Sequence, residues 1–376
     1  MSRAEEEFPQ PPWYQAAMWT GADLRALLRL FNANGWRVPL ASWPGCCIDL
    51  AFGMANSTLG ALQSIIYRSR IERVEFERDP LFIIGHWRTG TTLLHELLTL
   101  DPRHTYPTTY QCFMPCHFLL TERLLKPWTG FALPSNRPPD QMRTAWDSPQ
   151  EDEFALCNLG VPSPYATIAF PNNPPVFMEY LSLESLSPQE RTQWHLAWMR
   201  FLKSLQYHKP GRLVLKSPTH TCRLPALLEL FPNACFVNMV RHPMTVYLST
   251  VRLWKSLFST HGYQTPLYLG LNEFVLTTFD QMHRRLETTR ELVPPGRLID
   301  VYYENLVDDM VGTMQSIYEQ LELDGFSGVE RLIQEYVVEH RGYKPNQHHV
   351  TSELEAEVYE RWRTYYEKYG YSRFAT

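Results

Sequence analysis

A glycine-bounded loop follows the first long apolar run after residue 78. It reads GHWRTGTT from Gly85 to Thr92 and comes directly after LFII. It matches the phosphate-binding pattern G-x-x-x-x-G-K-[ST], except that Thr91 stands where the lysine is expected. A strand, such a loop and a helix, in that order, direct backbone N–H groups and the positive end of a helix dipole at one point. The loop therefore predicts an anion site, and phosphate is the anion that suits it best.

The missing lysine changes which ligand the loop can serve. A triphosphate site needs the lysine charge and a carboxylate that holds Mg²⁺ at the end of a neighbouring strand. The run CFVNMV is followed by Arg241 instead, and Asp300 lies inside another strand pattern. Arg88, within the loop, still brings a fixed cation to the ligand. We expect a ligand with fewer charges and no obligatory metal; a P-loop nucleotide kinase or other phosphotransferase is the main alternative.

Two further segments place polar side chains just after apolar runs. Arg241 follows CFVNMV, and Ser249 comes eight positions later on a helical pattern. Lys216 ends the run LVLK. Because the carboxyl ends of parallel strands gather at one edge of a sheet, these residues are expected beside the loop. Arg241 and Ser249 then suit a second anionic group.

Taken together, these segments resemble the sulfotransferase family, in particular the bacterial branch related to the tyrosylprotein and carbohydrate sulfotransferases. GHWRTGTTLL is similar to the family's 5′-phosphosulfate loop, and VRHPMTVYLST to its 3′-phosphate motif. LKSP resembles the strand-end lysine motif. VYYENL resembles the Tyr-Glu-Asp/Asn-Leu segment, which implies that Tyr303 contacts the adenine. The four motifs occur in family order over about residues 80–306.

The resemblance implies a donor and a reaction. The donor is 3′-phosphoadenosine 5′-phosphosulfate, its product is 3′,5′-adenosine bisphosphate, and the sulfuryl group passes in line to a hydroxyl or amine without a metal. Arg88 and Lys216 are implied to neutralise charge on the leaving oxygen. Arg241 and Ser249 are implied to hold the 3′-phosphate. Further donor contacts are implied for Thr89, Gly90, Thr91 and Thr92 at the 5′ end, and for Arg341, Lys344 or His348 in a basic C-terminal segment.

The general base is open at this point. No acidic residue follows Asp101 in DPRHTYPTTYQ, where related enzymes carry a glutamate, and Pro218 stands where others carry a histidine. An acceptor hydroxyl must nevertheless lose a proton. The candidates are the cluster Glu151, Asp152 and Glu153, then His220, then His104 or His117. A nucleotide-binding protein without catalytic activity is the remaining alternative.

The elements that must position these residues alternate between strand and helix. Strands are predicted at 81–84, 213–215, 235–240 and 298–302, and helices at 91–100, 219–231, 244–257, 306–321 and about 352–369. This order predicts an α/β, P-loop-like three-layer fold with a central parallel sheet. We expect one domain over 1–376: a helical N-terminal extension at 1–78, a core at 79–340 with a helical insertion at about 104–210, and a C-terminal loop and helix at 341–376.

Within the extension and the insertion, two patterns stand out. SPQE occurs at 148–151 and at 187–190, and each predicts a capping box at the start of a helix. The segment 38–67 carries Asp49 as its only charged residue, together with Pro44, Gly45, Gly53 and Gly60. It is expected to form a buried helical pair, or alternatively a lipid-facing surface that makes peripheral membrane contact.

Composition limits the partners. The net charge of −5 argues against a nucleic-acid partner. The seven cysteines are scattered and show neither C-x-x-C nor zinc-binding spacing. This pattern favours reduced thiols in the core and a cytoplasmic protein. The alternative is a cytoplasmic protein that also contacts the membrane surface. Aromatic residues in the insertion favour a small-molecule, lipid or saccharide acceptor, whereas the oligomeric state cannot be predicted.

Overall fold

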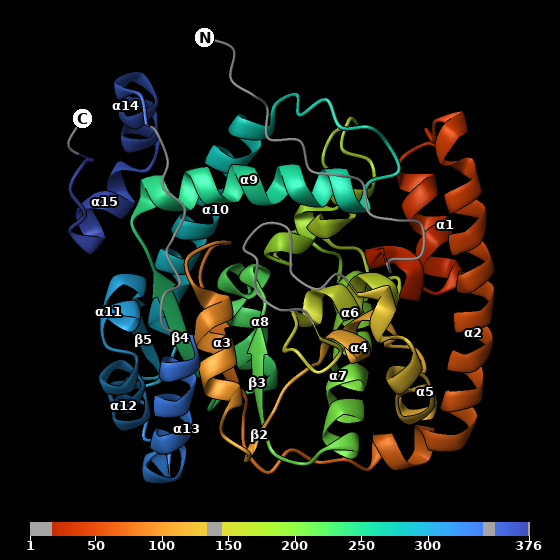
Figure 1. Cartoon of the computed structure of the whole chain (residues 1–376), viewed down its shortest axis with the longest axis horizontal. Helices are drawn as coiled ribbons and strands as arrows, with labels where there is room; N and C mark the ends of the chain where they lie inside the picture. Colours follow the sequence, from red (N-terminus) through yellow and green to blue (C-terminus); the bar gives the residue numbers. More distant parts are fainter. Residues whose placement is uncertain (1–16, 134–144, 341–349, 375–376) are drawn as a thin grey trace. The chain divides into compact units, whose positions relative to one another are not determined.

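The computed structural model describes residues 17–133, 145–340 and 350–374 (Figure 1). The described chain forms two compact units. Unit 1 comprises 17–75, 107–133, 145–208 and 252–269, and unit 2 comprises 76–106, 209–251, 270–340 and 350–374. Most described residues of the predicted N-terminal extension and of the predicted insertion thus belong to unit 1, and every predicted strand belongs to unit 2.

Unit 2 contains a parallel sheet of five strands in the order β2-β3-β1-β4-β5. The strands are β1 (Leu81–Ile84), β2 (His104–Thr105), β3 (Arg212–Lys216), β4 (Cys235–Val240) and β5 (Leu298–Tyr302). The predicted bounds of β1, β4 and β5 are confirmed, and β3 is one residue longer at each end. The two-residue β2 was not predicted, because two residues are too few to show a strand period.

Alternate residues of the strands face two helical layers, as strand geometry requires. Leu81, Ile83 and Val237 belong to a core that also includes residues of α3, α12 and α13. Phe82 points to the other face, where its ring stacks on Phe236 at 5.2 Å and lies near His220 and Phe231. This three-layer arrangement confirms the predicted fold class.

The helices of unit 2 differ from the predictions mainly by breaks. They are α3 (Thr91–Thr99), η7 (Pro218–Cys222), α8 (Leu224–Leu230), α10 (Leu271–Thr289), η8 (Arg290–Leu292), α11 (Tyr303–Asp308), α12 (Met310–Gln320), α13 (Phe326–Glu339), α14 (Ser352–Arg361) and α15 (Arg363–Tyr369). The predicted helix 306–321 is broken at Asp309, whose Oδ1 accepts from Gly312 N at 2.8 Å and caps α12. Helix α9 (Pro243–His261) begins in unit 2 and ends in unit 1.

Unit 1 is helical. Its elements are η1 (Met18–Gly21), α1 (Leu24–Ala33), η2 (Leu40–Ser42), α2 (Trp43–Glu72), α4 (Thr109–Phe113), α5 (Phe118–Leu125), η3 (Lys126–Trp128), η4 (Gly130–Ala132), α6 (Asp152–Asn158), η5 (Pro164–Ala169), η6 (Met178–Leu181) and α7 (Pro188–His208). The capping box at Ser187 is confirmed, since Glu190 N donates to its Oγ and its own N–H donates to Glu190 Oε2.

Two predictions for unit 1 are wrong. The helix expected after Ser148 begins only at Asp152, because Pro149 bridges Thr108 and Gln150 N donates to Pro107 O, which keeps this segment extended. The expected buried helical pair is one helix, α2, with a largely exposed face. Its Pro44 lies in the first turn, and Gly53 gives room to α1, since a Cβ there would lie 2.8 Å from Leu27 Cδ1. Within the described residues, no helix is both long and apolar enough to cross a membrane.

Candidate active site

The backbone of the loop between β1 and α3 takes conformations that favour glycine at both ends. Gly85 has φ +132° and Gly90 has φ +98°. A Cβ on Gly90 would lie 2.3 Å from Cδ2 of Tyr303, and one on Gly85 would lie 2.8 Å from the carbonyl oxygen of Met239. Both glycines are therefore required for two reasons: neighbouring residues leave no room for a side chain, and the turn needs a positive φ.

Hydrogen bonds inside the loop fix its shape. Thr89 is buried, and its Oγ1 donates to the carbonyl oxygen of His86 at 2.7 Å. The His86 ring lies against Phe279, and burial lowers the pKa of His86 to about 3, so the ring is neutral. The hydroxyl of Thr89, predicted as a donor to the ligand, thus contributes its proton to the loop itself.

Arg88, Arg241 and Ser249, which the sequence places in two separate motifs, lie in contact. The Nε of Arg88 donates to Ser249 Oγ at 2.8 Å, and Nη1 of Arg241 donates to the carbonyl oxygen of Arg88 at 3.0 Å. Arg88 has a left-handed backbone, with φ +70°, which brings its carbonyl to Arg241. Two guanidinium groups and a hydroxyl therefore gather beside the loop.

Aromatic residues hold Arg241 in place. Its guanidinium carbon lies 3.9 Å from the ring centroid of Tyr303. The hydroxyl of Tyr365, on α15, contacts both the amide nitrogen and the carbonyl oxygen of Arg241, at 3.2 and 3.3 Å. Tyr303 is only 9% exposed, between Gly90 and Arg241, so the structure gives it a supporting position. Its contact with adenine stays a prediction.

The end of β3 is joined to the start of the loop. Lys216 is 2% exposed and pairs in register with Ile83 of β1. Five residues later, Thr221 Oγ1 accepts from Gly85 N at 2.8 Å and donates to Gly85 O at 3.0 Å. His220, beside it, is fully buried with its ring edge-on to Phe82. Lys216 and His220 therefore belong to the same part of unit 2 as the loop.

The acidic cluster predicted as a base belongs to unit 1, around the start of α6. An oxygen of Glu151 accepts from the hydroxyl of Tyr165, Asp152 Oδ2 accepts from Trp198 Nε1 at 2.6 Å, and Glu153 accepts from Ser163 Oγ. Asp152 and Glu153 are fully buried. Each carboxylate thus has a structural partner within its own unit.

The remaining predicted residues divide into described and undescribed ones. Thr91 is buried and Thr92 partly exposed in the first turn of α3, where helical N–H groups have no partner within the helix. Arg341, Lys344 and His348 lie outside the described residues. His104 bonds to the carbonyl oxygen of Leu98 through Nδ1, and His117 to Asn56 and Thr121, so both have structural contacts.

Three residues of the site were not predicted: Thr221, Tyr365 and Thr250, whose Oγ1 donates to the carbonyl oxygen of Trp87 at 3.3 Å. Thr221 and Thr250 each stand next to a predicted residue, His220 and Ser249, so a search of motif neighbours would have included them. Tyr365 lies 124 positions from Arg241, and nothing local in the sequence signals that contact.

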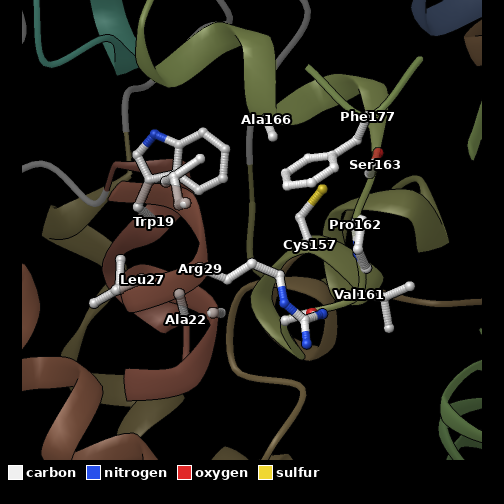
Figure 2. Close-up of a pocket in the computed structure, with 13 residues that line it drawn as sticks. Trp19, Ala22, Leu27, Arg29, Cys157, Val161, Pro162, Ser163, Ala166 and Phe177 are labelled. Atoms are coloured by element: carbon white, nitrogen blue, oxygen red, sulfur yellow. The ribbon is translucent and has the colours of Figure 1, made fainter. Parts of the chain in front are cut away.

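A separate small crevice opens in unit 1 between α1 and the segment after α6. Its walls are mainly apolar, and Figure 2 shows Trp19 and Leu27 near one side and Phe177 and Val161 near the other. The polar residues are Arg29, whose Nη1 donates to the carbonyl oxygen of Gly160, and Ser163, which binds Glu153. The space inside holds little more than a water molecule.

The family model described as "Sulfotransferase family" matches residues 80–328. This chain belongs to the sulfotransferase family. The matched range contains the loop, Lys216, Arg241, Ser249 and Tyr303, and it ends before α14. The sulfotransferase is therefore an enzyme that moves a sulfuryl group, for which 3′-phosphoadenosine 5′-phosphosulfate is the expected donor, and the kinase and non-catalytic alternatives are set aside.

Relatives agree with this assignment. The sulfotransferase is 41% identical over 360 residues to a protein of Mycobacterium bovis named omega-hydroxy-beta-dihydromenaquinone-9 sulfotransferase Stf3, a match that covers 96% of this chain and 92% of that protein. A protein of Mycobacterium tuberculosis with the same name matches to the same extent.

Solved structures support the fold. Sulfotransferase STF9 of Mycobacterium avium aligns with a TM-score of 0.63 at 20% identity, over 85% of this chain and 83% of that one. STF1 of Mycobacterium tuberculosis aligns with a TM-score of 0.62 at 20% identity, over 92% and 94%.

Proposed function

We propose that this sulfotransferase holds its donor at the loop of unit 2 and transfers the sulfuryl group to the hydroxyl of a lipid alcohol. The observation that carries the donor site is the contact of Arg88 with Ser249, reinforced by Arg241 on the Arg88 carbonyl. Two fixed cations and a hydroxyl beside the start of a helix suit a ligand with two separate anionic groups.

The roles of the side chains follow from their positions. The N-terminus of α3 and Thr92 are proposed to hold the 5′ end, and Arg241 with Ser249 the 3′-phosphate. The donor brings an activated sulfuryl group on a phosphate oxygen. Lys216 is buried at the strand end, where a positive charge is screened little by water and stabilises charge on a leaving oxygen.

For the base we favour His220 over the acidic cluster. Thr221, the next residue, binds both backbone polar groups of Gly85, so His220 is tied to the loop. Asp152 and Glu153 instead bind Trp198 and Ser163 while fully buried, which is typical of structural carboxylates. Burial of His220 also means that acceptor binding must expose its ring or bring the hydroxyl to it.

A lipid alcohol is favoured by the relatives. The Mycobacterium bovis protein is named for an omega-hydroxy menaquinone, which carries a hydroxyl on an apolar chain.

The proposal is tested by offering the purified enzyme and donor three acceptors in detergent: a long-chain prenyl alcohol, a phenol and a monosaccharide. The expected result is a sulfated prenyl alcohol detected by mass spectrometry, with a kcat/KM at least about tenfold above that of the other two. Transfer to the phenol or sugar alone would overturn the lipid assignment but leave the donor site in place.

A further inference from the structure

Helix α2 has its polar and apolar faces reversed relative to a helix of a water-soluble surface. Its buried residues include Asp49, Asn56 and Gln63, spaced seven apart. Its exposed residues include Ile48, Phe52, Met54, Leu62 and Ile65, of which Ile65 is 82% exposed. A helix on the surface of a globular protein normally turns its apolar stripe inward, so this face needs an explanation other than folding.

The reversed orientation is fixed by hydrogen bonds within unit 1. Asp49 Oδ2 accepts from the hydroxyl of Tyr263 at 2.8 Å. Asn56 Nδ2 donates to the carbonyl oxygens of Thr20 and Ala22 at 2.9 and 3.0 Å, and Gln63 Oε1 accepts from Leu119 N at 2.8 Å. Rotation of α2 to bury its apolar face would break all of these bonds. The hydrogen bonds therefore keep the apolar face exposed.

The exposed apolar face of α2 is long. Between Ile48 and Ile66 it runs for about 27 Å along the helix, at 1.5 Å per residue. Exposed apolar residues also occur on α5, η3 and η4: Leu124 at 69%, Trp128 at 79% and Phe131 at 70% exposure. In Figure 1 the other labelled helices of unit 1 lie to one side of α2.

Basic residues outnumber acidic ones in the segments 37–71 and 118–133. The acidic residues there are Asp49 and Glu122, at 9% and 6% exposure, and the basic ones are Arg37, Arg68, Arg70, Arg123 and Lys126. Two of the basic residues are in ion pairs: Arg68 with Glu72, and Lys126 with Glu122 and Asp147. Outside these pairs the segments carry Arg37, Arg70 and Arg123, so their charge runs against the net charge of −5 of the whole chain.

We infer that the α2 face, defined by Ile48, Phe52, Leu62, Ile65 and Ile66, docks on the surface of an anionic lipid bilayer. Apolar side chains enter the boundary between headgroups and acyl chains, and the arginines at the rim meet lipid phosphates. For the lipid alcohol proposed as acceptor, the bilayer would be the place from which the enzyme takes it. The docking inference itself rests on the surface of α2 and does not depend on the acceptor.

The test is flotation of the full-length protein with vesicles, without donor or acceptor. One set contains equal parts phosphatidylglycerol and phosphatidylcholine, and the other phosphatidylcholine only. The wild type should float with the anionic vesicles, and Ile65→Glu and Phe52→Glu should each weaken partitioning about tenfold or more. Leu269→Glu, a change at an 81% exposed leucine in a turn of unit 1, should leave partitioning within about twofold. Arg70→Glu should weaken binding to the anionic set only.

Exposed Cys47 on α2 provides a second readout, because its reaction with a maleimide should slow when anionic vesicles are added. The inference is overturned if the wild type stays out of the lipid fraction, or if Ile65→Glu floats as well as the wild type. It is also overturned if the wild type sediments as a dimer that Ile65→Glu converts to a monomer, which would mean that a second copy covers the face. Because no sulfuryl transfer is measured, failure here and failure of the proposed function are distinguishable.

Discussion

The Nε of Arg88 donates a hydrogen bond to Oγ of Ser249 over 2.8 Å, although 161 positions separate the two residues. One belongs to the loop after β1 and the other to the second turn of α9. Their contact joins the two sequence motifs into one site, and the carbonyl of Arg88, bound by Arg241, adds the third member. The donor site is therefore a coupled group of residues.

Removing Arg88 and Ser249 should be non-additive. A hydrogen bond to a charged group contributes about 1.5–3 kcal/mol, so Arg88→Ala should weaken binding of 3′,5′-adenosine bisphosphate by about 10- to 150-fold. Ser249→Ala should weaken it less, and the double variant should be weaker than the wild type by less than the product of the two effects. Calorimetric titration of the four proteins measures the coupling. Strict additivity would mean that the contact has no part in ligand binding.

Gly90→Ala should destabilise the loop by more than the strain of a positive φ at an alanine accounts for. The new methyl group would meet the ring of Tyr303, and the residue keeps φ +98°. Gly296, also in unit 2 with φ +76° but with nothing within 4 Å of a Cβ, is the matched control. Gly296→Ala should cost about 1–2 kcal/mol of stability from backbone strain and leave bisphosphate affinity unchanged. If Gly90→Ala behaves like this control, the contact with Tyr303 does not set the loop.

His220 and Glu151 can be separated as candidate bases. His220→Gln should lower kcat by about 10²-fold or more, as for loss of a general base, while bisphosphate affinity changes little. Glu151→Gln should have a much smaller effect, because its carboxylate accepts from Tyr165 and the amide oxygen can do the same. A silent His220→Gln together with an inactive Glu151→Gln would reverse the assignment.

Asp49 makes stability depend on pH. Burial raises its pKa from the usual 3.8 to about 6. The native state then binds the proton more tightly than the unfolded chain, so this contribution is fully present below about pH 4 and is lost as pH rises to about 6. Asp49→Asn, which keeps an acceptor for Tyr263, should therefore gain stability over the wild type across that window, by up to about 3 kcal/mol above pH 7. Urea unfolding at several pH values gives the difference, and a difference independent of pH would contradict the account.

The sequence was sufficient wherever a pattern is local. Strands β1, β4 and β5 were predicted to the residue because each is a short, mainly apolar run, and the loop because its glycines and threonines have fixed spacing. The four residues SPQE at 148–151 could not show by themselves that this segment is extended and not helical. Its extended conformation depends on contacts with Thr108 and Pro107.

Contacts between distant residues account for the other differences. Thr221 on Gly85 and Tyr365 on Arg241 are visible only in the folded chain. The sequence likewise did not show that α2 continues through Gly53 and Gly60. In the folded chain Leu27 and Cys116 occupy the space that side chains at these two positions would take. The donor contacts of Arg341, Lys344 and His348, which lie outside the described residues, stay predictions.

The central claim is that the loop of unit 2 binds a nucleotide with a 5′-phosphate group and a 3′-phosphate. Calorimetric titration of the wild type with 3′,5′-adenosine bisphosphate, 5′-AMP and Mg·ATP tests it most directly. The account predicts that the bisphosphate binds about 100-fold more tightly than 5′-AMP, as expected for one further charged group held by Arg241 and Ser249, and that Arg241→Ala removes most of this preference. Equal affinity for the bisphosphate and 5′-AMP, or preference for Mg·ATP, would contradict it.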